Sequence, residues 1–184
     1  MQLSALTYDF WESPAPVAAQ IAEPFHLCAD LHFGHKNLLQ YEPIRAQLAN
    51  TFEEMDELLI ARWNSQIKAE DDVLLLGDVS MCNTARTIEM VNRLNGRKHL
   101  VIGNHDRDHT TTFWRRLFVQ TWNTPIIIGS TLYSHEPVSP AYLAKYGAIL
   151  NVHGHTHSKS FCGDRRYCCV SLESTGMRPL SLCY

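Results

Sequence analysis

Four short apolar runs in this chain each end in a group of histidine, aspartate or asparagine side chains. Apolar runs of this length are typical of buried strands. Open α/β sheets hold their functional sites where the carboxyl ends of neighbouring strands meet, so we expect the four polar groups to gather at one edge of a sheet. The runs cover residues 25–29, 73–76, 100–102 and 148–152, and they lead to Asp30 and His32, to Asp78, to Asn104, His105 and Asp106, and to His155 and His157.

The first half of the chain alternates between strand and helix patterns. Its longest predicted helix covers residues 51–68, where Thr51 and Glu54 form a capping box and apolar residues recur at spacings of three and four. Shorter helices are expected over 38–41 and 84–94. Alternation of this kind favours a largely parallel sheet with helices on its faces.

The second half has the pattern of hairpins and added strands. Residues 124–128 and 131–134 predict two strands joined at a glycine turn, and Ser139 and Pro140 predict the start of a short helix. The remaining elements are one helix and two strands, expected over 111–119, 168–172 and 180–182. The prediction is therefore an α/β fold with a mixed sheet system.

Length and composition indicate one folded domain. The chain has 184 residues, of which 45% are hydrophobic and 19% charged, as in ordinary globular proteins. Residues 1–24 contain three prolines and show no clear periodicity, so we interpret them as an irregular leader before a domain at 25–184. No linker or internal repeat divides that domain.

The charge and the apolar runs also restrict partners and location. The net charge of −3 gives no broad positive field, which argues against long nucleic acid as a partner. No apolar run approaches the ~20 residues of a membrane span, and the N-terminus lacks the pattern of a secretory signal. We expect a cytoplasmic protein with no membrane partner, and the sequence does not define its oligomeric state.

Six residues of these polar groups, together with His135, form a set of oxygen and nitrogen donors without cysteine, which suits borderline divalent ions such as Mn, Fe, Zn, Co or Ni. Seven donors exceed what one ion needs at a site that stays open to water and substrate. We interpret them as ligands of two ions that share a bridging carboxylate. Such a pair clamps the oxygens of a phosphate ester and lowers the pKa of a bridging water, so that hydroxide attacks phosphorus. The seven candidates are Asp30, His32, Asp78, Asn104, His135, His155 and His157.

In their order along the chain, these groups resemble the five sequence blocks of the calcineurin-like metallophosphoesterases, over residues 25–182. The stretches 30–37 and 52–58 resemble the small stand-alone members of bacteria and phages. The resemblance implies a four-layer α-β-β-α sandwich with two mixed sheets and a dinuclear site at the strand ends. The five blocks are Asp30-x-His32, Gly77-Asp78, Gly103-Asn104-His105-Asp106, His135 and Gly154-His155-Thr156-His157.

The resemblance also implies a role for each residue of the blocks. His105 corresponds to the family's histidine that is not a ligand, which orients substrate or protonates the leaving group, and Asp106 would hold its imidazole. Manganese is the favoured metal. The first ion would take Asp30, His32, Asp78 and His157, and the second Asp78, Asn104, His135 and His155, so that Asp78 bridges.

Further substrate contacts are expected from residues that lie near these ligands in the sequence. The candidates for the substrate phosphate are Asn104, His35, Asn37 and Arg107.

We therefore expect a metal-dependent phosphoesterase. Because the chain is compact and has no evident specificity domain, the expected substrate is a small mono- or diester, such as a nucleotide, a cyclic nucleotide or an RNA end. A nuclease acting on DNA or RNA strands is the alternative, but it would need a basic groove or stacking aromatic residues. A non-catalytic, protein-binding scaffold on the same fold is a weaker alternative, because all seven ligand positions carry a suitable residue.

Overall fold

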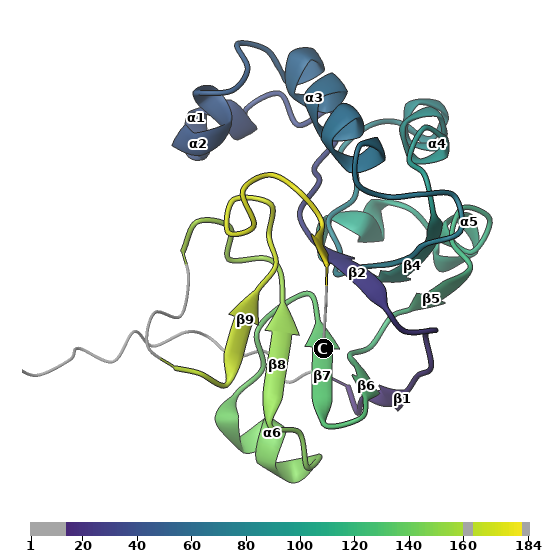
Figure 1. Cartoon of the computed structure of the whole chain (residues 1–184), viewed down its shortest axis with the longest axis vertical. Coiled ribbons are helices and arrows are strands. Elements are labelled where there is room, and N and C mark those ends of the chain that lie inside the picture. Colours follow the sequence, from purple (N-terminus) through teal and green to yellow (C-terminus); the bar gives the residue numbers. More distant parts are fainter. Residues whose placement is uncertain (1–13, 160–163, 182–184) are drawn as a thin grey trace, which may run out of the picture.

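Two five-stranded sheets pack face to face in the computed structural model, which describes residues 14–159 and 164–181 (Figure 1). The first sheet has the order β10-β2-β3-β4-β5, with β10 antiparallel to β2 and its other neighbours parallel. Its strands are β2 (Phe25–Cys28), β3 (Asp72–Leu75), β4 (Arg97–Val101), β5 (Gln120–Trp122) and β10 (Leu180–Ser181).

The second sheet has the order β1-β6-β7-β8-β9 and is also mixed. The hairpin of β6 and β7 is antiparallel, as the sequence predicts, whereas β7, β8 and β9 are parallel to one another. Its strands are β1 (Val17–Ala18), β6 (Ile126–Ile128), β7 (Thr131–Ser134), β8 (Leu150–His153) and β9 (Tyr167–Cys169).

Alternating side chains of β3 and the residue after it divide the interior into separate cores. Val73 and Leu75 point to the helix side of the first sheet, and Leu74 and Leu76 point to the space between the sheets. All four are fully buried, which explains why this strand is a continuous apolar run rather than an alternating one. The chain thus places one apolar core on each face of its central strand.

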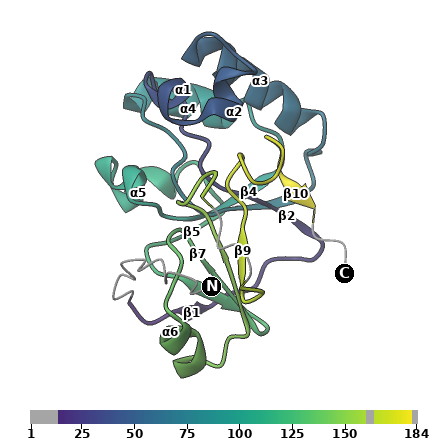
Figure 2. The same cartoon turned by 90° about the vertical axis from the view of Figure 1, so that its left-hand side faces the viewer.

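Helices cover the outer face of each sheet, so that the chain has four layers (Figure 2). On the first sheet, α3 (Phe52–Asn64), α4 (Thr84–Asn92) and α5 (Thr111–Trp114) contribute Trp63, Met90 and Trp114 to the core. On the second sheet, α6 (Pro140–Lys145) packs Leu143 against Leu132. The predicted four-layer sandwich of two mixed sheets in a single domain is confirmed.

A side-chain cap begins each longer helix, and the caps at Thr51 and Ser139 agree with the start signals in the sequence. Thr51 accepts a hydrogen bond from the N–H of Glu54, and Asn83 and Ser139 cap α4 and α6 in the same way. α3 ends at Asn64, short of the predicted residue 68, and its chain continues as a turn. None of the helices among the described residues is both long and apolar enough to cross a membrane.

Several short elements also differ from the expectation or were absent from it, and β9 lies over Tyr167–Cys169 instead of residues 168–172. α1 (Leu38–Tyr41) is found as predicted, but α2 (Pro43–Ala46) follows it at once, with Pro43 in its first turn, where a missing N–H costs nothing. α5 ends five residues before the predicted residue 119, and β5 follows it. β1 lies within residues 1–24 and pairs with β6; the domain boundary at residue 25 remains a prediction.

Candidate metal centre

The polar groups that follow the strands meet at one edge of the two sheets. The turn after β2 lies against the turn after β3, because the N–H groups of Asp30 and His32 donate to the carbonyls of Gly77 (3.0 Å) and Asp78 (2.9 Å). The turn after β8 joins the turn after β7 through the N–H of Gly154, which donates to the carbonyl of His135 at 2.9 Å. The backbone thus brings together turns that lie far apart in the sequence.

Asp30, His32 and His157 form the first cluster of ligand-type atoms. Each offers one atom, and the three atoms lie within 4.8 Å of one another. The Oδ1 atom of Asp30 is 3.8 Å from Nε2 of His32 and 4.0 Å from Nε2 of His157. These separations leave room for an ion between the three atoms.

Asp78, His135 and His155 form the second cluster, again within 4.8 Å. Nδ1 of His155 is 3.2 Å from Nε2 of His135. The Oδ1 atom of Asn104 completes the group, at 2.8 Å from Nε2 of His135 and 3.1 Å from Nδ1 of His155. The two clusters therefore contain all seven predicted ligands, in the grouping that the sequence resemblance implies.

The carboxylate of Asp78 lies between the two clusters. Its Oδ2 atom is 3.5 Å from Nε2 of His32 and 3.3 Å from Nε2 of His135. Its Oδ1 atom accepts the backbone N–H of His105 at 3.0 Å, which fixes the rotation of the carboxylate. One oxygen of Asp78 is thus shared by a histidine from each cluster.

Several buried atoms of the first cluster have no hydrogen-bond partner among the described residues. They are Oδ1 of Asp30, both ring nitrogens of His32 and Nδ1 of His157, and burying such atoms without a hydrogen-bond partner costs free energy. Burial also lowers the pKa of the His32 imidazole well below its ordinary value, so its ring is neutral and keeps a lone pair for a ligand bond. The donor set and its unpartnered atoms fit a divalent cation.

The backbone at this edge is strained at the ligand-type residues. Six non-glycine residues of the described ranges have a positive φ, a conformation that costs an L-residue free energy. Five belong to the two clusters, namely Asp30 (60°), His32 (52°), Asp78 (56°), His155 (67°) and His157 (50°). Strain at these positions indicates that the surrounding fold fixes these five residues in a backbone conformation that they would not prefer on their own.

Gly77 and Gly103 let two of the turns touch. A side chain on Gly77, where φ is 82°, would place its Cβ 2.6 Å from both Cα of Gly103 and Nδ1 of His135. A Cβ on Gly103 would lie 2.3 Å from Oδ1 of Asp78. The glycines in these two sequence blocks are therefore required by close approach around Asp78.

Asp106 has partners that differ from the one expected. Its buried carboxylate accepts the backbone N–H groups of Gly103 (2.9 Å), Asp78 (2.8 Å) and Val79 (2.8 Å). No hydrogen bond joins it to the His105 ring in the described part of the chain. The expectation that Asp106 holds that imidazole is corrected: the carboxylate faces three converging amide groups, and it joins the turns after β3 and β4.

His105 is half-buried beside the first cluster. Its ring meets that of His32 edge to face, with the ring centroids 5.4 Å apart. His105 opens the 3₁₀ helix η1 (His105–Asp108), which directly follows Asn104. Its imidazole therefore lies next to the ligand-type atoms without belonging to either cluster.

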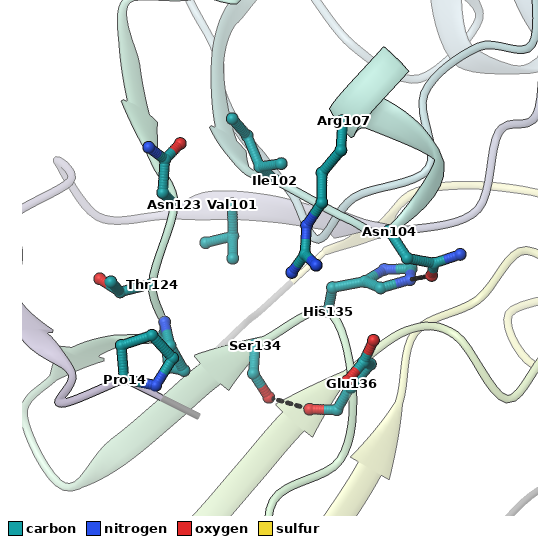
Figure 3. Close-up of a pocket in the computed structure, with 11 residues that line it drawn as sticks. Pro14, Val101, Ile102, Asn104, Arg107, Asn123, Thr124, Ser134, His135 and Glu136 are labelled. Atoms are coloured by element: carbon teal, nitrogen blue, oxygen red, sulfur yellow. Dashed lines mark hydrogen bonds between the residues drawn. The ribbon is translucent and has the colours of Figure 1, made fainter. Parts of the chain in front are cut away.

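The candidate substrate contacts lie at different distances from the clusters. Arg107 is exposed, and its side chain extends from η1 toward a hollow that Asn104 and His135 also line (Figure 3). The ring of His35 is 5.6 Å from that of His32. Asn37 is exposed at the start of α1 and makes no cap hydrogen bond. Arg107 and Asn104 thus share a hollow, and His35 flanks the first cluster.

Three residues that the sequence did not single out support the first cluster. The hydroxyl of Ser171 donates to Oδ2 of Asp30 at 2.6 Å. Arg45 and Glu173 form a buried ion pair that contacts the residues around Asp30 and His157. No local pattern marks these residues, because they reach the cluster only through tertiary packing.

Comparisons with known proteins show which family the chain belongs to. The model of the calcineurin-like phosphoesterase family matches residues 23–166. Protein MJ1445 of Methanocaldococcus jannaschii is 30% identical over 165 residues, which make up 85% of this chain and 86% of that protein. The gene 66 protein of Mycobacterium phage L5 is 38% identical over 84 residues, or 44% of this chain and 39% of the phage protein.

A solved structure supports the same fold. The protein AQ665 of Aquifex aeolicus superposes with a TM-score of 0.67 at 24% identity, covering 86% of this chain and 95% of that chain. The family match spans most of the chain and includes all five sequence blocks. This chain therefore belongs to the calcineurin-like phosphoesterase family and is a metal-dependent phosphoric ester hydrolase.

Proposed function

We propose that the chain hydrolyses a small phosphate monoester or diester with two divalent ions, of which manganese is the favoured identity. The observation that supports this most directly is the shared Oδ2 atom of Asp78, with His32 on one side and His135 on the other. Ions bound there would polarise the phosphoryl oxygens and lower the pKa of a water, which supplies hydroxide near neutral pH.

The two clusters would divide the ligands between the ions, with the Asp78 carboxylate in common. Asp30, His32 and His157 would hold the first ion, and Asn104, His135 and His155 the second. Ligand histidines must be neutral, and burial, as the largest cause, lowers the pKa of both His32 and His155, the latter to about 4. The pKa values of His32 and His155 thus favour neutral ligands at neutral pH. At His135 the contact with Asp78 outweighs burial and raises the pKa to about 9, and the pKa of His157 is raised as well, so an ion held by these two rings would have to displace a proton.

His105 would act on the leaving group of the ester. It is half-buried and lies beside His32, and its backbone N–H is anchored on Asp78. An imidazole in this position can act as a general acid toward the departing alkoxide. Asp106 would act indirectly, by holding the backbone that presents Asp78 and His105.

The hollow beside Asn104 and His135 is where the rest of the substrate would lie. Arg107 enters it as an exposed cation (Figure 3), and guanidinium groups bind phosphate oxygens through paired hydrogen bonds. His35 would contact the phosphate from the other side, next to His32, with Asn37 two residues further along. A nucleotide, a cyclic nucleotide or an RNA end carries groups that suit these side chains.

The test compares hydrolysis of p-nitrophenyl phosphate and bis-p-nitrophenyl phosphate by protein stripped of metal and then reloaded with Mn²⁺. Activity should return with the metal and be absent in Asp78→Ala, which removes the shared oxygen. Preference between the two substrates would separate monoesterase from diesterase activity. If neither compound nor a panel of nucleotides is cut while long RNA or DNA is degraded, the small-substrate proposal is wrong.

A further inference from the structure

A fully buried ion pair lies behind the first cluster. Nε of Arg45, in α2, donates to Oε1 of Glu173 at 2.5 Å, and neither side chain is exposed. Taking two charges out of water costs free energy, so such a pair persists only where further contacts compensate for this cost. Those contacts show which part of the molecule the ion pair stabilises.

Arg45 holds the turn that carries Asp30 and His32. Its Nη2 atom donates to the carbonyl of Asp30 at 2.5 Å, and its Nη1 atom to the carbonyl of Leu31 at 3.1 Å. Asp30 and His32 both have a positive φ, so this turn is strained and needs external support. The guanidinium fork supplies that support with a fixed geometry.

Glu173 holds the third member of the cluster. Its Oε1 atom is 3.2 Å from Nδ1 of His157, while Nε2 of the same ring faces Asp30. The contact is a close approach without hydrogen-bond geometry. A carboxylate this close to Nδ1 favours the proton on that nitrogen and leaves Nε2 as the ligand atom. Arg45 and Glu173 together therefore contact both segments that supply the first cluster.

The second cluster is supported in a different way. Nδ1 of His135 lies 2.7 Å from the backbone carbonyl of Leu76. The contacts of Arg45 and Glu173 described above reach the first cluster and not the second. A change in the ion pair should thus separate the behaviour of the two clusters.

We propose that Arg45 and Glu173 are positioning residues that set the affinity of the ion held by Asp30, His32 and His157 independently of the other ion. This inference rests on the proposed two-ion site. The pair orients the His157 ring from behind and fixes the turn of Asp30 and His32, so that three ligand atoms converge before an ion binds. Loss of the ion pair would leave the three ligand side chains in the protein but no longer oriented toward a common ion.

The test is a Mn²⁺ titration of metal-free protein by calorimetry, read together with the electron paramagnetic resonance spectrum. Wild type should bind two ions that are magnetically coupled. Glu173→Gln should weaken one ion by about 10–100-fold, the effect typical of a lost ligand-supporting contact, and leave the other unchanged. At intermediate Mn²⁺ this variant should show the six-line spectrum of an isolated ion.

Two further variants distinguish a loss of positioning from a loss of folding. The double variant Arg45→Met/Glu173→Gln removes both charges and leaves no unpaired buried ion, so it should fold and show the same selective loss. Glu89→Gln breaks the exposed ion pair of Arg86 and Glu89 on α4 and should leave both affinities unchanged. Chemical unfolding in chelator measures the stability of each variant separately from metal binding.

The outcomes are distinct. A wild-type protein that binds fewer than two ions contradicts the proposed two-ion site itself. The positioning role would be overturned if the wild type binds two ions but the Glu173→Gln and double variants bind both ions with equally reduced affinity. It would also be overturned if these variants bind both ions as tightly as the wild type does. Selective loss of one ion in both variants, with Glu89→Gln unchanged, supports it.

Discussion

The carboxylate of Asp106 accepts the backbone N–H of Asp78 at 2.8 Å. The same carboxylate accepts the amides of Gly103 and Val79, so one buried side chain joins the turns after β3 and β4. Burial, as the largest cause, raises the pKa of Asp106 to about 6, and the group is still mainly ionised at neutral pH. It therefore acts as an acceptor for all three amides there.

Replacing Asp106 by asparagine should destabilise the metal-free protein by about 1–3 kcal/mol, because one carboxylate oxygen becomes an amide nitrogen that faces N–H donors. The Mn²⁺ affinity should fall as well, since the Asp78 backbone loses its anchor. Urea unfolding in chelator and a metal titration measure the two effects. Asp108→Asn changes an exposed carboxylate of the same 3₁₀ helix and serves as the control; equal stability of the two variants would contradict the role of Asp106.

The sequence predicts most of the candidate site because its polar groups follow apolar runs that form strands, whereas His135 is a candidate only through its order along the chain. Parallel strands end at a common edge, so local patterns suffice to bring Asp30, Asp78 and Asn104 together. The partner of Asp106 could not be predicted in this way. Its neighbour His105 is the obvious candidate, whereas the fold supplies amides up to 28 residues away.

The elements missed in the sequence are those that tertiary contacts define. β1 and β5 have two and three residues, which are too few for a periodic pattern. β1 forms by pairing with β6, and β5 forms by pairing with β4. Arg45 and Glu173 are separated by 128 residues. In the sequence each resembles a surface residue, and only packing makes them a buried pair.

His105→Ala should keep both ions but lower kcat by about 10²–10⁴-fold, the range for loss of a general acid. The side chain lies beside His32 without contributing to either cluster. Elemental analysis after gel filtration measures the metal, and initial rates with p-nitrophenyl esters measure the loss. By contrast, Asp78→Ala should lose metal and activity together. If His105→Ala loses as much metal as Asp78→Ala, the division of roles between the two residues is wrong.

Arg107→Ala should raise KM for nucleotide substrates about tenfold while kcat changes little, because the guanidinium would bind substrate in the hollow beside Asn104. A tenfold change in KM corresponds to about 1.4 kcal/mol of binding free energy. The effect should shrink in high salt. Arg115→Ala, which removes another exposed arginine after α5, should leave KM unchanged. Equal KM changes in the two variants would point to a general charge effect instead of a contact.

Asp56 predicts a measurable pH dependence of folding. Its carboxylate, on α3, accepts the N–H of Gly34 at 3.1 Å in the turn that follows His32. Burial is the largest cause of the shift, and it raises the pKa of Asp56 to about 6 from an ordinary 3.8. Between these values the folded chain binds more protons than the unfolded chain, so the contribution of Asp56 to the free energy of unfolding falls as pH rises.

The prediction is tested by the difference in unfolding free energy between the wild type and Asp56→Asn, both in chelator. An asparagine does not titrate, so other groups cancel in the difference. The wild type should lose stability relative to the variant as pH rises from about 4 to about 6, and the difference should be constant above that range. A flat difference would show that the Gly34 hydrogen bond offsets the effect of burial, and a difference that grows in favour of the wild type would show that the bond outweighs burial and lowers the pKa of the carboxylate.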